Sequence, residues 1–297
     1  MMTLEPSRFL TRRYLELDQV ALHASSEAEG FGVANLLDDA RSQVWRATST
    51  DAAHVDLDLG QALPVNCLAV VNHNLSYEGR IIISAGAAQG GGERLAIEED
   101  AWECLWGADE CAADEHGADG YPSNEERARY FPAGSLRLIY LAELVSARWW
   151  RVGLVGPAWA DEYNPTGLIQ AGAIIPGFYF RSDRRVCAPL PAGPGSETKL
   201  EYSDGGQHWR AEGPRYRGGK YKFEQLDAGQ AVGSWWDLLQ EVDVGLSFVA
   251  DFFPGAASQV LRLRHQIYCH QPKSQGQPIS LDRMTRGALT LEVRESY

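Results

Sequence analysis

Alternation of apolar and polar residues is the clearest pattern in this chain, and it predicts a mainly β protein. Between residues 54 and 60 every second side chain is apolar, namely Val55, Leu57 and Leu59, the pattern of a strand with one buried and one solvent-facing side. Residues 67–71 are continuously apolar, which is typical of a strand covered on both faces. Further strand-like runs follow along the whole chain.

A helical period appears in one place, residues 227–244. Apolar side chains recur there at intervals of three and four, at Val232, Trp235, Trp236, Leu239 and Val242. Asp227 is a suitable N-cap and Gly245 a suitable end. We predict one amphipathic helix packed on a sheet, with the tryptophan pair in the core rather than in a cofactor site.

Turn-forming residues divide the chain. A polar cluster at residues 163–167 indicates a boundary near residue 160, and residues 203–206 (Ser-Asp-Gly-Gly) indicate a hairpin turn. We therefore predict a β-sandwich over residues 23–160 and a second β domain over residues 161–297 that contains the helix. Residues 1–22 form an N-terminal arm or strand, which either stands apart or joins the second domain.

Composition narrows the function classes. The 297 residues carry a formal net charge of −13, which argues against a general nucleic-acid binder, because phosphate binding needs clustered Lys and Arg. We find no secretory signal and no apolar run of membrane-spanning length, so we expect synthesis in the cytoplasm and no membrane insertion. The five cysteines lack C-x-x-C spacing, which favours reduced thiols, although a disulfide between Cys104 and Cys111 stays open.

Catalytic motifs are missing from the sequence. It contains no G-x-S-x-G, no H-E-x-x-H, no phosphate-binding glycine loop and no calcium-binding loop. A pair of carboxylates for glycoside cleavage stays open, because separation in space is invisible in a sequence. We expect no enzyme, no catalytic residue, no cofactor and no metal site.

The segment of residues 98–126 is strongly acidic and is too long for a simple turn. Trp102 and Trp106 lie four residues apart in it, so one helical turn would place both rings on the same face. They either pin the segment onto its own domain or contact a neighbouring subunit or a sugar. Trp102, Trp106 and Tyr121 are therefore candidates for ligand or partner contact.

Basic residues gather after residue 180 and contrast with that acidic segment. They include Arg181, Arg184, Arg185, Arg215 and Arg217. Opposite charges on one subunit can meet head to tail and close a ring, and these arginines are the candidate inter-subunit patch. The alternative, that both regions are solvated surfaces, stays open.

Several short motifs give the chain a resemblance to known proteins. In the first half they are Ala24-Ser25-Ser26, Asn35-Leu36-Leu37-Asp38-Asp39, Val44-Trp45-Arg46, Asn72-His73-Asn74-Leu75 and Arg148-Trp149-Trp150-Arg151. These motifs resemble a discoidin-like (galactose-binding-like) jelly roll. Together with Gly205-Gly206-Gln207, Pro214-Arg215-Tyr216-Arg217 and Leu289-Thr290-Leu291-Glu292-Val293, their order along the chain resembles the distal tail (baseplate) proteins of siphophages and prophages.

That resemblance implies a structural role without catalysis. Such a protein forms a ring, commonly a hexamer, that joins the tail tube protein to tip, hub or fibre proteins at the tail tip of the virion. The alternative is a carbohydrate-binding module or receptor-binding virion protein that contacts host surface polysaccharide through Trp45, Trp102, Trp106 or Tyr121. Under the ring hypothesis, the Asp38-Asp39 and Asn72-His73-Asn74 segments are turns of the scaffold rather than ligand sites.

Overall fold

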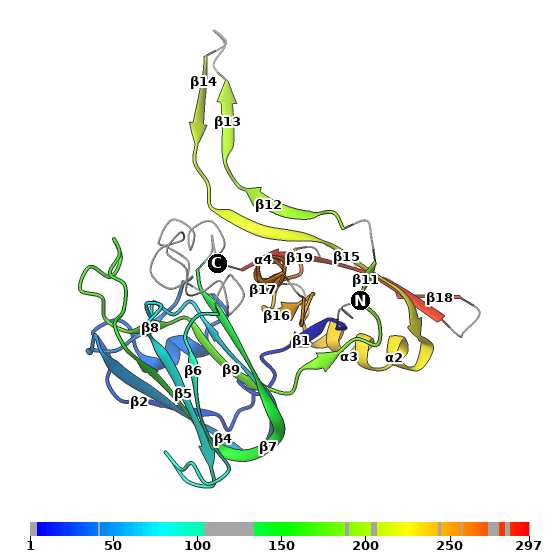
Figure 1. Cartoon of the computed structure of the whole chain (residues 1–297). Coiled ribbons are helices and arrows are strands. Elements are labelled where there is room, and N and C mark those ends of the chain that lie inside the picture. The colour runs from blue at the N-terminus through cyan, green and yellow to red at the C-terminus, as the bar shows by residue number, and fades with distance from the viewer. Residues whose placement is uncertain are drawn as a thin grey trace.

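The computed structural model describes residues 5–40, 42–103, 134–187, 190–202, 207–242, 245–256, 258–272, 279–282 and 286–296. Within these ranges the protein is mainly β, with short helices in the second half (Figure 1). This confirms the fold class that the alternation predicts.

The first half forms a β-sandwich. Its elements are β2 (Ala21–Ala24), the 3-10 helix η1 (Val33–Leu37), β3 (Trp45–Arg46), β4 (Ala52–Val71), β5 (Arg80–Gly86), β6 (Leu95–Asp100), β7 (Leu136–Val155), β8 (Gln170–Ala171) and β9 (Ala173–Gly177). The main sheet has the order β2-β4-β7-β5-β6, β9 also pairs with β4, and β3 pairs with β8.

Two strands of 20 residues each, β4 and β7, organise this sandwich. Their antiparallel ladder shifts register between Asp58 and Leu63, next to Gly60 with its φ of +75°. The first half of β4 pairs with β2 and the second half pairs with β9. The bent ribbon therefore contributes to both sides of one core, which contains Val55, Leu57, Leu68 and Val70.

The sandwich runs past the boundary that the sequence places near residue 160. β8 pairs with β3, and β9 pairs with β4 along residues 67–71, so the chain leaves the sandwich only after Gly177. The polar cluster at residues 163–167 is instead a turn inside this unit, where Asn164 is buried and holds the backbone through Leu168. Turn chemistry marks the end of an element and does not distinguish a loop from a linker.

The second half is built on a sheet of nine strands. They are β1 (Arg8–Leu10), β10 (Phe180–Arg181), β11 (Val186–Cys187), β12 (Ala192–Ser196), β15 (Arg215–Asp227), β16 (Phe248–Asp251), β17 (Gln266–His270), β18 (Ser280–Asp282) and β19 (Arg286–Glu295). The order is β10-β1-β16-β17-β19-β15-β11, with β12 beside β15 and β18 beside β19. The N-terminal strand β1 thus lies inside this sheet, and the helix α4 (Gln259–Arg264) precedes β17.

The sheet of the second half separates two hydrophobic cores. On β17, Ile267 and Cys269 belong to the core under the helices, whereas Tyr268 between them belongs to the core of the sandwich. The same alternation divides β16, where Phe248 lies on the helix side and Val249 on the sandwich side. Because successive side chains of a strand point to opposite faces, the sandwich and the sheet pack directly against each other.

The predicted helix over residues 227–244 is broken into two. α2 (Ala228–Val232) and α3 (Ser234–Glu241) meet at Gly233, a residue that disfavours continuation of a helix. Asp227 is the N-cap as predicted, since its side chain accepts hydrogen bonds from the amides of Gly229 and Gln230. The tryptophan pair is divided: Trp235 is fully buried and Trp236 is exposed, so only the first packs in the core.

A hairpin projects from the second half (Figure 1). β13 (Lys199–Tyr202) pairs with β14 (His208–Ala211) in a two-stranded sheet of their own, on either side of the predicted turn. We call these two strands the arm. Its base is the ladder between β12 and the first residues of β15, which continues into the nine-stranded sheet.

Candidate functional site

The Asn72-His73-Asn74 triplet is a turn of the scaffold. Asn72 has a φ of +54°, a conformation that Asn tolerates better than most residues. Asn74 is buried. Its amide donates to the carbonyl of Leu168 at 2.8 Å, and its side-chain oxygen accepts from the amide of Gln170 at 3.0 Å. His73 is buried against the ring of Trp102, so the predicted structural role is confirmed.

The Asp38-Asp39 turn joins the two halves of the protein. Asp38 accepts a hydrogen bond from the amide of Ala40 at 2.7 Å, as expected for a turn. Asp39 reaches the second half, where both its oxygens accept from the amide of Ser247 at 3.0 Å. Tyr268 also donates to its backbone carbonyl at 3.2 Å. This carboxylate therefore fixes the seam between the sandwich and the nine-stranded sheet.

A second buried network crosses the same seam. The hydroxyl of Tyr140 on β7 donates to Asp251 on β16 at 2.9 Å, and Arg8 lies over the rings of Tyr140 and Tyr179. Glu103 accepts from Arg137 of the sandwich and from Arg262 of α4. Burial raises the pKa of Asp251. These contacts lock the two halves together rather than leaving a hinge between them.

The outer face of the β4–β7 ribbon is polar, and on it two partly exposed arginines cover two largely buried carboxylates. Arg151 donates to both oxygens of Asp56 at 2.6 and 2.8 Å, and Arg148 donates to both oxygens of Asp58 at 2.7 Å. The hydrogen bonds from Arg148 lower the pKa of Asp58. The Asp56 and Asp58 side chains, predicted to face water, are therefore covered by arginines of the neighbouring strand.

The aromatic residues proposed for sugar contact lie inside the protein where they are described. Trp102 is 3% exposed, and its indole donates to the carbonyl of Leu75 at 2.7 Å. Trp45 is fully buried, and its indole donates to the carbonyl of Ser26 at 3.0 Å, so its ring points inward. Neither ring has a free face for stacking. Trp106 and Tyr121 lie outside the described residues.

The candidate basic patch is only partly on the surface. Arg181, Arg184, Arg185 and Arg215 are exposed. Arg217, in contrast, is buried and pairs with the fully buried Glu295 on β19, with its Nε 3.1 Å from either carboxylate oxygen. Arg217 therefore belongs to the interior of its own chain and not to an inter-subunit surface, because its buried charge needs that partner.

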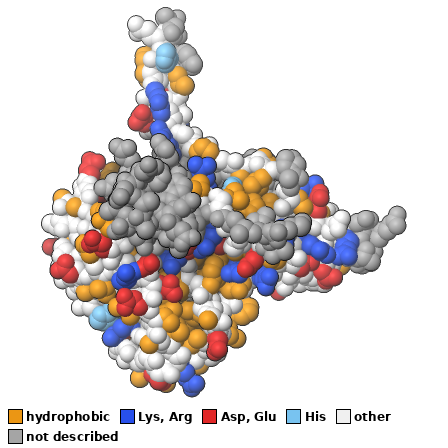
Figure 2. All heavy atoms as spheres, viewed as in Figure 1, with side chains coloured by type: hydrophobic (Ala, Val, Ile, Leu, Met, Phe, Trp, Pro, Cys, Tyr) orange, Lys and Arg blue, Asp and Glu red, His pale blue; other side chains and the backbone are white. Residues whose placement is uncertain are grey.

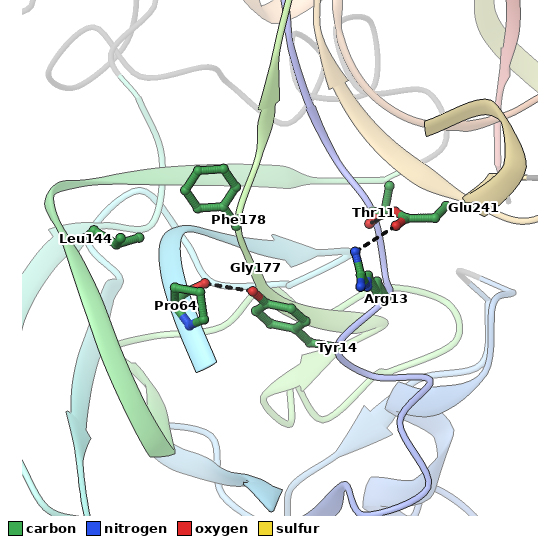
Figure 3. A pocket seen from close by; sticks show the side chains of 8 residues that line it. All are labelled: Thr11, Arg13, Tyr14, Pro64, Leu144, Gly177, Phe178 and Glu241. Carbon is green, nitrogen blue, oxygen red and sulfur yellow. Dashed lines mark hydrogen bonds and ion pairs between the residues drawn. The ribbon is translucent and has the colours of Figure 1, made fainter. Parts of the chain in front are cut away.

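A groove of about 310 Å³ lies where the two halves meet (Figure 3). Arg13 and Thr11 both bond to Glu241, each at 3.0 Å, and Tyr14 donates to the carbonyl of Pro64 at 2.9 Å. The side chains of Leu144 and Phe178 border the groove and are more than half exposed. Because the arginine is already neutralised, the groove can accept an apolar side chain but offers no free charged group.

Metal and redox chemistry find no support in the described residues. These contain no group of three or more His, Cys, Asp or Glu side chains that could hold a metal ion. Cys67, Cys187 and Cys269 are free thiols there, and burial raises the pKa of Cys67. Cys104, Cys111 and their conceivable disulfide lie outside the described residues. Across the same ranges, no helix is both long enough and apolar enough to cross a membrane.

The loops at one end of the sandwich carry an exposed aromatic ring. Tyr163 is 83% exposed, in a turn where Asp161 accepts from the amides of Tyr163 and Asn164, both at 2.8 Å. Nearby, Arg46 bonds to the side chain of Gln170 at 3.0 Å, and Asn164 also reaches Gln170. These three polar side chains are buried and support the turn from below, so only the ring of Tyr163 faces solvent. Sequence reasoning missed this ring because Tyr163 lay in a segment taken for a linker.

The arm exposes large apolar side chains to solvent. Leu200 on β13 is 54% exposed, and Trp209 on β14 is 53% exposed. Register places Leu200 opposite Arg210 and Glu201 opposite Trp209, so the two apolar side chains lie on opposite faces of the ribbon. Figure 2 shows the arm projecting beyond the body, with basic, acidic and apolar side chains along it. The sequence signal was the hairpin turn, which does not reveal exposure.

Comparisons with known proteins extend to fold alone. No protein-family model matches the chain, and no curated protein matches it. Among solved structures, a GH29 fucosidase of Ruminococcus gnavus in complex with fucose is 10% identical, with a TM-score of 0.38 over 57% of this chain and 27% of that one. This chain thus spans about a quarter of the fucosidase.

Carbohydrate-binding modules are also among the similar structures. The module CpGH89CBM32-5 of Clostridium perfringens, in complex with GalNAc-β-1,3-galactose, is 13% identical, with a TM-score of 0.36 over 57% of this chain and 99% of that one. The family 32 module of NanJ of C. perfringens, in complex with galactose, is 11% identical, with a TM-score of 0.34 over 59% of this chain and 99% of that one. At these values the similarity carries no conclusion about ligands, and the protein is defined by its own structure as a mainly β protein.

Proposed function

We propose that this protein is a structural subunit of a larger protein assembly and that the arm is the element joining one subunit to the next. The observation that carries the proposal is the arm itself: a separate two-stranded sheet with a large apolar side chain exposed on each face. An isolated two-stranded hairpin is marginally stable in water. A partner that covers both faces would supply the missing packing.

The rest of the protein suits a rigid building block. The seam between the halves is held by Asp39, by the Tyr140–Asp251 bond and by Glu103, so a load applied to one half passes to the other. No paired catalytic groups line the groove of Figure 3. We propose a role without catalysis on these grounds.

The resemblance to distal tail proteins indicates which assembly the subunit would belong to. In it, copies of the chain form a ring, commonly a hexamer, at the tail tip of a virion between the tail tube and the tip or fibre proteins. The ring contact runs head to tail, because the arm lies at one side of the subunit and repeated heterologous contacts of this kind close into rings. The net charge of −13 agrees with protein partners rather than nucleic acid.

Oligomeric state tests the proposal. Light scattering and native mass spectrometry of the full chain should show a defined oligomer at micromolar concentration. A variant in which residues 199–211 are replaced by two glycines should be monomeric with an unchanged melting temperature, because the arm adds nothing to either core. Tyr163→Ser, a change at a more exposed aromatic residue away from the arm, should leave the oligomer intact. A wild-type chain that stays monomeric over the whole concentration range contradicts the proposal.

Carbohydrate binding is the second candidate, and one observation favours it: the ring of Tyr163 is 83% exposed in a loop at one end of the sandwich. Aromatic faces of this kind suit stacking on an apolar sugar face. Isothermal titration with galactose-containing oligosaccharides and host surface polysaccharide should show binding that Tyr163→Ala abolishes and Trp209→Ala leaves unchanged. Absence of heat with every glycan removes this candidate without affecting the assembly proposal.

A further inference from the structure

The outer face of α2 and α3 carries apolar surface that its own chain does not cover. Val232 and Trp236 lie four residues apart and are 56% and 54% exposed, while Trp235 fills the core beneath. Ala231 and Trp235, the residues just before them, are both buried in the core, so Val232 and Trp236 lie on the side of the two helices that faces away from it. A tryptophan that is half exposed and adds nothing to the core needs an explanation outside the core, and apolar surface of this kind marks interaction sites when it is contiguous.

The same face is acidic and hollowed. Asp237 and Glu241 lie one turn apart on α3, and a hollow of about 390 Å³ is lined by Arg13, Asp237, Gln240 and Glu241. Glu241 is engaged by Arg13 and Thr11. Asp237 is exposed, so its charge is at the disposal of a partner.

One face of the arm has the complementary character. Register places Leu200 directly opposite Arg210, and His208 lies two residues from Arg210 on the same strand. These three side chains therefore share a face. Arg210 pairs with Glu212, just past the end of β14, at 3.7 Å, with both side chains more than half exposed, and a pair of that kind is weak. The arm face thus offers an apolar side chain next to an arginine.

We propose that the outer face of α2 and α3 receives the arm of the next copy of this chain. Leu200 packs on Val232 and Trp236, and Arg210 lies against Asp237 at the hollow. This inference rests on the proposed function, and it names the receiving surface of the same contact. The arm projects away from α2 and α3 within one subunit (Figure 1), so the contact joins different copies, and the opposite placement of the two surfaces makes it heterologous.

Charge reversal tests the contact, because like charges placed opposite each other are disfavoured at an interface. Arg210→Glu and Asp237→Arg should each raise the concentration for half-assembly by about tenfold or more. Two restorations are expected: the double variant Arg210→Glu/Asp237→Arg should assemble alone, and an equal mixture of the two single variants should assemble together. Analytical ultracentrifugation measures all four samples, with the exposed Asp18→Arg as a control of equal charge change.

The outcomes separate this inference from the proposed function. If Asp237→Arg assembles like wild type while the arm replacement does not, the arm docks elsewhere and only the inference fails. If neither restoration occurs, the Arg210–Asp237 contact is wrong. Trp236→Ser should weaken assembly without lowering the melting temperature, because its ring is outside the core, and an unchanged assembly would overturn the apolar part. A monomeric wild-type chain removes both proposals at once.

Discussion

Two antiparallel ribbons in this protein share a backbone geometry but differ in how far the rest of the chain buries their side chains. β4 and β7 pair over most of 20 residues each, and their inward side chains, such as Leu57 and Trp150, are fully buried. β13 and β14 pair over four residues each and leave large apolar side chains exposed. The hydrogen-bonded ladder is therefore common to both, and burial is what distinguishes them.

The difference teaches which interactions hold a ribbon in place. Net stabilisation by a backbone hydrogen bond is only about 1 kcal/mol, because water competes for the same groups, whereas burying a large side chain contributes about 2–3 kcal/mol. The β4–β7 ribbon is stabilised within its own chain. The arm has the hydrogen-bonded ladder without the burial. For this reason we propose that another copy of the chain buries its apolar side chains.

The largest expected effect is the difference between two substitutions, each of one tryptophan in one of the two ribbons. Trp150→Ala should lower the free energy of unfolding by about 3–5 kcal/mol, because it opens a cavity in a closed core. Trp209→Ala should change it by less than about 0.5 kcal/mol in dilute monomer. Urea denaturation of the full chain measures both. Equal losses would show that the arm is as well packed as the sandwich and would break the comparison.

A smaller effect is expected where the uncovered ribbon joins the covered body. Glu295→Gln removes the buried charge that pairs with Arg217 at the base of the arm, and leaving that arginine unpaired should cost about 3 kcal/mol. Glu292→Gln, in the exposed pair with Lys220 on the same two strands, should cost less than about 1 kcal/mol. Thermal or urea denaturation compares them, and similar losses would contradict the assignment of Arg217 to the interior.

A third expected effect is a dependence of stability on pH at the half-buried residue His265. The pKa of His265 is lowered from its ordinary 6.5 to about 4. Burial is the main cause, and the nearby positive charges of Arg217 and Arg264 add to it. Between these two values the unfolded chain takes up a proton that the folded chain refuses, so stability falls as pH falls from 6.5 to 4.

His265→Gln should make the decline of stability over this pH window shallower than in wild type. Above pH 6.5 the difference between the two proteins should be constant, because the imidazole is then neutral in both the folded and the unfolded state. Urea denaturation at a series of pH values measures this difference. Parallel curves between pH 4 and 6.5 would show that His265 is not the titrating group.

Local features were predictable from the sequence. The alternation at residues 54–60 identified a stretch of β4 and its buried side, the side chain of Asp227 identified the N-terminal cap of α2, and Asn72 identified a turn. Each of these depends on side chains a few residues apart, where spacing in the sequence sets spacing in the structure.

Contacts between distant segments were not predictable. Arg217 meets Glu295 across 78 residues, so a basic run could not be told from a basic surface. Trp102 is buried by its bond to Leu75 and its contact with Trp159, neither of which its acidic sequence context reveals. Trp236 is exposed because the buried side of the helices runs through Ala231, Trp235, Leu238 and Val242 instead of the predicted set. In all three, tertiary packing decided what local pattern left open.

The placement of β1 has a consequence for the order in which the two halves of the protein fold. Phe9 on β1 is flanked by Phe180 on β10 and by Ala250 on β16, while every strand of the sandwich lies between β1 and β10 in the chain. On the ribosome the sandwich strands emerge together and can fold as a unit. The N-terminal strand must wait until residues 248–251 are synthesised, so the nine-stranded sheet is the last part to form.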